Sequence, residues 1–198
     1  MNTVELIFKN ISEIAGVDDI GLLILTDMAD EQQIAVPCKK KQLDSFRLRL
    51  SQAPVTNSML PEVMWQAMRW FLDRPMEVVI NEVNEGQYKA LLIATELGMQ
   101  LPILASEGIL LTLVSKGQVP IKVEEHLFRR QSTPYNKDNV SLSLPINTIT
   151  DKMLDAALQK AVQNENYEMA GHLRDEMKRR DELRNKEKEN TILDHEGD

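Results

Sequence analysis

The sequence predicts an α+β fold: a largely antiparallel sheet with packed helices, followed by a C-terminal α-helical hairpin. Three observations lead to this class. Apolar segments with the alternation or length of strands are separated by polar turns in the first part of the chain. Two of them, residues 76–83 and 88–95, flank the turn 84–87 as in a β-hairpin. Beyond residue 151, apolar residues recur at helical spacing instead.

The N-terminal segments predict three strands and a short helix. Residues 4–8 alternate as a strand does, and residues 21–26 form the continuous apolar run of a buried strand. Residues 33–36 can pair with this run across the polar turn 27–31. Residues 43–50 contain the apolar positions of a short helix.

Pro61 begins the clearest helix, because proline is favoured in the first helical turn. Arg74 and Pro75 end it. Its predicted apolar stripe consists of Val63, Met64, Ala67, Met68 and Phe71.

The predicted hairpin at residues 76–95 is followed by a further strand at 100–104. Ser106 is a candidate N-cap for the next helix, which Gly117 stops. A short strand at 119–123 and a helical turn at 124–128 complete this part of the chain.

Changes in composition predict the domain organisation. Residues 1–131 form the α+β domain, and residues 132–150, with two prolines and many Ser, Thr and Asn residues, form a linker. Residues 151–183 form the helical hairpin, with Asn164 to Asn166 as its turn. Residues 184–198 are expected to be a charged, disordered tail.

Composition also limits the function and the setting. The formal charge is −8, so bulk charge does not predict a nucleic-acid-binding protein, although metal ions that screen phosphates would permit an acidic nuclease. The single cysteine, Cys38, excludes an internal disulfide and a cysteine-based zinc cluster. Because no signal-peptide pattern or membrane-spanning apolar run is present, a soluble, cytoplasmic protein without a membrane partner is expected.

The second half of the hairpin contains a distinctive motif. Residues 166–177, Asn-Tyr-Glu-Met-Ala-Gly-His-Leu-Arg-Asp-Glu-Met, resemble the UVR motif, a helical hairpin at partner-binding tips of bacterial excision-repair subunits and some protease adaptors. The resemblance implies a protein partner that contacts Tyr167, Leu173, Arg174 and Asp175. The alternative is an ordinary helical hairpin that covers part of the core, since its periodicity would be the same.

The preceding segment, residues 3–131, resembles the bifunctional nuclease domain in the order of its elements. Residues 101–113, Leu-Pro-Ile-Leu-Ala-Ser-Glu-Gly-Ile-Leu-Leu-Thr-Leu, and residues 119–123, Val-Pro-Ile-Lys-Val, are similar to the family's signature. In the family, an Arg-Pro-Ser-Asp-Ala helix start precedes an Ala-Pro-Ile-Tyr-Val strand. The resemblance implies a bifunctional-nuclease-like fold and hydrolysis of DNA or RNA phosphodiester bonds with Mg²⁺ or Mn²⁺ as cofactor.

The resemblance also assigns candidate site residues. Ser106 and Glu107 match the serine and aspartate of the signature, and Glu62 matches an acidic residue at the start of the preceding helix. These three are the candidate catalytic residues, with Glu62 and Glu107 as metal ligands. A structural role competes, because a carboxylate in the first turn of a helix stabilises that helix whether or not it takes part in catalysis.

The chain departs from the family at three candidate positions. Leu104 or Ala105 replaces the signature arginine, Pro61 replaces a histidine, and Gln42 replaces a glutamate of the first helix. These departures favour a second function, a catalytically degenerate scaffold or adaptor that binds a repair, protease or nucleic-acid-processing partner through the hairpin. A third candidate is a regulatory domain that binds a small anion at the helix N-terminus near Ser106.

Two tryptophans occur on the predicted helix that begins at Pro61. Trp65 and Trp70 are five residues apart, and packing in the core or at an interface is favoured for them over stacking on nucleic-acid bases. Together with an exposed apolar edge, they make self-association into a homo-oligomer an expectation.

Overall fold

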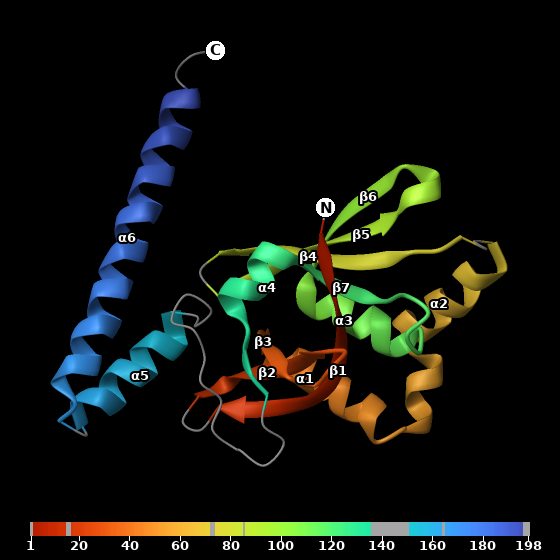
Figure 1. Cartoon of the computed structure of the whole chain (residues 1–198), viewed down its shortest axis with the longest axis horizontal. Helices are drawn as coiled ribbons and strands as arrows, with labels where there is room; N and C mark the ends of the chain where they lie inside the picture. The colour runs from red at the N-terminus through yellow and green to blue at the C-terminus, as the bar shows by residue number, and fades with distance from the viewer. Residues whose placement is uncertain are drawn as a thin grey trace. The chain divides into compact units, whose positions relative to one another are not determined.

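The computed structural model describes residues 2–14, 17–71, 74–84, 86–135, 151–163 and 165–195 (Figure 1). The chain divides into two compact units, Met1–Thr148 and Ile149–Asp198. The first unit contains an eight-stranded, mostly antiparallel sheet with helices, which confirms the predicted mixed α+β class. None of the described helices is long and apolar enough to cross a lipid bilayer.

The strands of the sheet lie in the order β6-β5-β4-β7-β1-β2-β3-β8. Neighbouring strands pair in antiparallel fashion except β4 and β7, which are parallel. Because β7 lies between β4 and β1, its side chains Ile121 and Val123 are fully buried. The strands are β1 (Thr3–Ile14), β2 (Val17–Asp27), β3 (Gln32–Lys39), β4 (Glu77–Asn84), β5 (Gln87–Ala94), β6 (Met99–Leu104), β7 (Ile121–Glu124) and β8 (Thr133–Pro134).

The first two strands extend beyond the predicted segments. β1 continues to Ile14 and β2 begins at Val17, although polar residues such as Asn10 interrupt the apolar alternation of β1. Ile11 pairs with Leu23 in the ladder between the two strands. Pairing with the strongly apolar β2 therefore sustains a strand that local alternation does not predict.

The predicted linker begins too early. β8 pairs with the start of β3, and the backbone N–H of Tyr135 donates a hydrogen bond of 2.8 Å to the carbonyl oxygen of Glu31. These bonds keep the chain attached to the sheet through Tyr135. The remainder of the predicted linker, residues 136–150, lies outside the described residues.

Within the described part of the first unit, four α-helices and two short 3₁₀ helices connect the strands. α1 contacts β2 and β3, whereas α3 contacts β3, β4 and β5 (Figure 1). Leu43 and Phe46 of α1 and Ile109 of α3 are buried in the core. The helices are α1 (Lys40–Leu50), η1 (Pro54–Ser58), α2 (Leu60–Phe71), η2 (Thr95–Leu97), α3 (Ala105–Val114) and α4 (Glu125–Gln131).

Only part of the predicted apolar stripe of α2 packs against the core. Trp65 and Met68 pack against the core, but Val63 and Met64 are 47% and 49% exposed. Trp70 is 87% exposed, which excludes the core position and leaves the interface position as the remaining prediction for this side chain. The helix is apolar around much of its circumference, and spacing alone therefore could not determine which side faces the core.

The described part of the second unit consists of two consecutive helices in contact, α5 (Asp151–Gln163) and α6 (Tyr167–His195). Leu154, Ala161, Ala170 and Leu173 are buried. α6 continues past residue 183, into the segment for which the sequence predicts disorder. This segment is rich in Glu, Lys and Arg, which have high intrinsic helix propensity.

Two helical glycines are expected to respond to alanine in opposite ways. A Cβ atom added to Gly108 in α3 would lie 2.6 Å from Cγ1 of Val78, a fully buried β-branched side chain with little rotamer freedom. Overpacking costs ~1–3 kcal/mol, more than the gain of up to ~1 kcal/mol in helix propensity, so Gly108→Ala should destabilise the first unit. A Cβ atom on Gly171 in α6 meets nothing within 4 Å, so Gly171→Ala should stabilise the second unit by up to ~1 kcal/mol.

Denaturant unfolding of the full chain measures both glycine substitutions. Both tryptophans of the chain lie in the first unit, so their fluorescence follows that unit. Far-ultraviolet circular dichroism follows the helices, including α5 and α6. A shift in the same direction for both variants would contradict the packing described for Gly108 and Gly171.

Candidate functional site

Three of the candidate positions meet where α1 and α3 begin. The side-chain amide of Gln42 donates one hydrogen bond to Oγ of Ser106 (2.9 Å) and another to Oε1 of Glu107 (2.7 Å). Oε1 of Gln42 accepts a hydrogen bond from the backbone N–H of Lys39 (3.1 Å). Because a backbone N–H can only donate, this bond fixes which end of the amide faces Ser106 and Glu107.

Ser106 does not cap the helix as predicted. The N-cap position of α3 is Leu104, without a side-chain hydrogen bond, and the helix begins at Ala105. Ser106 is 7% exposed, and its hydroxyl instead accepts the hydrogen bond from Gln42. The hydroxyl therefore binds Gln42, which is distant in the sequence, instead of a backbone N–H of its own helix.

Glu62 lies in a separate ion pair. Its Oε2 accepts a hydrogen bond from Nη2 of Arg49 (2.8 Å), and its Oε1 lies 2.7 Å from Arg49 Nε without the alignment of a hydrogen bond. The two side chains are only 5% and 14% exposed. Arg49 also donates to the backbone carbonyl of Ser45 (2.8 Å). The carboxylate of Glu62 is thus neutralised by a cation of the protein itself.

The donor set does not fit the Mg²⁺ or Mn²⁺ site that the resemblance implies. Such ions need several oxygen ligands around one point. Among the described residues, no group of three or more His, Cys, Asp or Glu side chains is close enough together to hold a metal ion. Glu107 faces the amide donor of Gln42, and Glu62 faces a guanidinium.

The arrangement also lacks the geometry of an activated nucleophile. A serine hydroxyl becomes a nucleophile when a general base lies within hydrogen-bonding distance. The partner of Ser106 is the amide of Gln42, which does not accept a proton at neutral pH. The cluster of Gln42, Ser106 and Glu107 therefore connects the first turns of α1 and α3. Its one exposed carboxylate is that of Glu107.

The predicted partner-binding residues divide into two groups. Tyr167, Arg174 and Asp175 are exposed on α6, with Tyr167 70% exposed, so a partner could reach them. Leu173 is 3% exposed and serves the packing of α5 against α6 rather than a surface.

Sequence reasoning missed Arg180, whose side chain is 2% exposed. It lies 3.1 Å from Asp151 of α5 and 2.9 Å from Glu176 of α6. A signal was present, since Arg180 continues the helical spacing of the buried residues Ala170 and Leu173. A cation at an otherwise apolar position of a helix predicts a buried ion pair.

No protein-family model matches the chain, and no curated protein sequence matches it.

Proposed function

We propose that this protein is a non-catalytic scaffold or adaptor. Its first unit is a bifunctional-nuclease-like domain that has lost phosphodiester hydrolysis, and its second unit is a UVR-like hairpin that binds a protein partner. The observation behind the loss of hydrolysis is the pair of hydrogen bonds from Gln42 to Ser106 and Glu107.

The chemistry of position 42 supports this proposal. A glutamate in place of Gln42 would set two carboxylates against each other, because the amide nitrogen lies only 2.7 Å from Glu107. Two carboxylates at that distance repel unless a cation or a proton lies between them. Glutamine turns this repulsion into a hydrogen bond and removes the requirement for a cation. The ion pair of Glu62 with Arg49 has the same effect on the other candidate carboxylate.

The second unit supports the partner-binding half of the proposal. Its buried surface holds α5 and α6 together, while Tyr167, Arg174 and Asp175 remain exposed on one helix. Exposed tyrosine and arginine side chains are enriched at protein-binding surfaces. A small anion at the start of α3 is less favoured, because the carboxylate of Glu107 already occupies that first turn.

We expect the full chain not to cleave labelled single- or double-stranded DNA or RNA, with Mg²⁺, Mn²⁺ or EDTA present. The variant Gln42→Glu recreates the carboxylate pair and should bind Mn²⁺ more tightly than the unaltered chain. Thermal unfolding with and without Mn²⁺ measures this difference, and Gln42→Glu with Glu107→Gln is the matched control that removes the pair again. Metal-dependent cleavage by the unaltered chain that disappears in the Glu62→Gln, Glu107→Gln variant would overturn the proposal in favour of a nuclease.

A further inference from the structure

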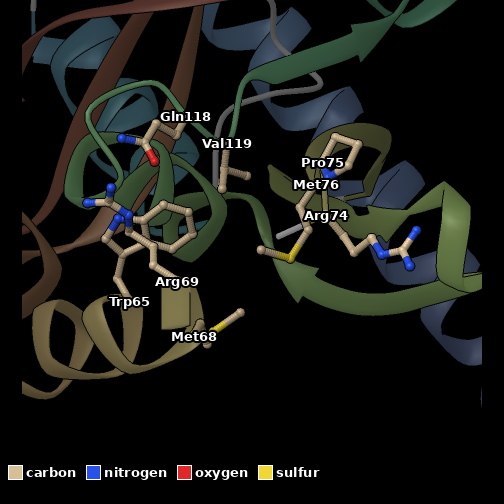
Figure 2. Close-up of a pocket in the computed structure, with 8 residues that line it drawn as sticks. All are labelled: Trp65, Met68, Arg69, Arg74, Pro75, Met76, Gln118 and Val119. Atoms are coloured by element: carbon tan, nitrogen blue, oxygen red, sulfur yellow. The ribbon is translucent and has the colours of Figure 1, made fainter. Parts of the chain in front are cut away.

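A pocket of about 370 Å³ lies between the end of α2, the start of β4 and the turn before β7 (Figure 2). Trp65 and Arg69 of α2 form one side, Met76 lies across from them, and Gln118 and Val119 come from the turn. This volume falls in the range of small-molecule sites. The pocket does not include Gln42, Ser106, Glu107 or Glu62.

The apolar part of the pocket is held rigidly. Met76 and Val119 are 6% and 1% exposed, and both belong to the core of the first unit. The indole of Trp65 packs against the same core while it lines the pocket. A ring fixed by the core loses little conformational freedom when a flat ligand stacks on it.

The polar part of the pocket suits an anion. Figure 2 shows the guanidinium of Arg69 and the amide of Gln118 on the same side of the pocket as the indole of Trp65. Within the described part of the chain, Arg69 has no ion-pair or hydrogen-bond partner, and no acidic residue lines the pocket. Arg74 is different, because it turns away from Trp65 and pairs with Glu96.

We propose that this pocket binds a nucleoside monophosphate group. The heteroaromatic ring stacks on Trp65, the guanidinium of Arg69 binds the phosphate through charge-assisted hydrogen bonds, and the amide of Gln118 bonds to the base or the sugar. The same group occurs as a free nucleotide and as the phosphorylated end of a nucleic-acid chain. Binding of this group does not depend on the adaptor role proposed above, and it requires no cleavage.

Tryptophan fluorescence can report on the pocket directly. The chain contains two tryptophans, so Trp70→Phe leaves Trp65 as the sole reporter. In this background, adenosine and uridine monophosphates should quench the fluorescence in a saturable way. Inorganic phosphate and adenosine, each added alone, should bind at least about tenfold more weakly because each provides only half of the contacts. A 5′-phosphorylated dinucleotide that binds more tightly than the mononucleotide would assign the site to a nucleic-acid end, and equal binding would assign it to a free nucleotide.

Arg69→Gln should weaken nucleotide binding by about tenfold or more, since it removes the charge-assisted bonds. Arg129→Gln, which changes an exposed arginine of α4 outside the pocket, is the matched control and should bind like the parent. The proposal fails if no nucleotide produces saturable quenching. It also fails if Arg69→Gln binds as tightly as the control, or if phosphate alone binds as tightly as the nucleotide.

Discussion

Leu173→Asp is expected to unfold the second unit while the first unit stays folded. Leu173 is 3% exposed at the contact of α5 with α6. Loss of a buried leucine costs ~2–5 kcal/mol, and a buried carboxylate without a partner adds further cost. A unit as small as Ile149–Asp198 has a small core, and such units are marginally stable. The loss of stability caused by the substitution should therefore be larger than the free energy of unfolding of this unit.

Circular dichroism and tryptophan fluorescence report on the two units independently. Far-ultraviolet circular dichroism should lose the helical signal of α5 and α6, whereas the denaturant midpoint followed by tryptophan fluorescence should not change. His172→Asp introduces the same charge at the adjacent, exposed position and is the matched control. Unchanged helicity in Leu173→Asp would contradict the packing of α5 on α6. Under the proposed function, a bound partner should be lost with Leu173→Asp, whereas a partner retained by this variant would show that the hairpin is not the attachment site.

The strands that the sequence predicts correctly are those whose own side chains alternate or form an apolar run. β4 and β5 are of this kind. A short turn also places them next to each other, so their pairing is local. β8 is not of this kind, because it pairs with β3, which lies about one hundred residues earlier in the sequence. The side-chain amide of Gln33 in β3 donates a hydrogen bond to the backbone carbonyl of Pro134 in β8. A two-residue strand held by such a contact leaves no local pattern to detect.

The same distinction applies to the candidate site. The substitution of glutamine at position 42 is visible in the sequence, but its two bonds reach residues 64 and 65 positions away. Likewise, the placement of Glu62 at a helix start is predictable, whereas its capture by Arg49 of the preceding helix depends on how α1 and α2 pack. Sequence reasoning therefore finds the residue types, and only the tertiary structure determines which charges each of them meets.

Arg180→Ala is expected to destabilise the second unit by ~1.5–3 kcal/mol, because it removes the charge-assisted hydrogen bonds of a side chain that is only 2% exposed, while Arg179 still pairs with Glu176. Nε of Arg180 lies 2.9 Å from Oε1 of Glu176, whose side chain is only 12% exposed, and Nη1 lies 3.1 Å from Asp151 on α5. Alanine has the highest helix propensity, so the loss cannot come from the helix itself. Thermal unfolding followed by circular dichroism measures the effect.

Arg179 provides a matched control, because it contacts the same carboxylate from the surface. Its Nη2 lies 2.7 Å from Glu176, but its side chain is 55% exposed, and solvent screening limits such a pair to ~0–1 kcal/mol. Arg179→Ala should therefore change the stability far less than Arg180→Ala, and equal effects would contradict the assignment of burial as the cause.

Acid should act on the same ion pair. The hydrogen bonds from Arg179, together with one from Arg180 and the positive charge of both, lower the pKa of Glu176 below its ordinary value of 4.5. A folded-state pKa below the unfolded value stabilises the folded state above pH 4.5, and this contribution is lost as the pH falls through the folded-state pKa. The second unit should therefore melt at lower temperature as the pH falls below 4.5, and this dependence should weaken in both arginine variants. A melting temperature that responds to acid equally in all three proteins would show that Glu176 is not the group responsible.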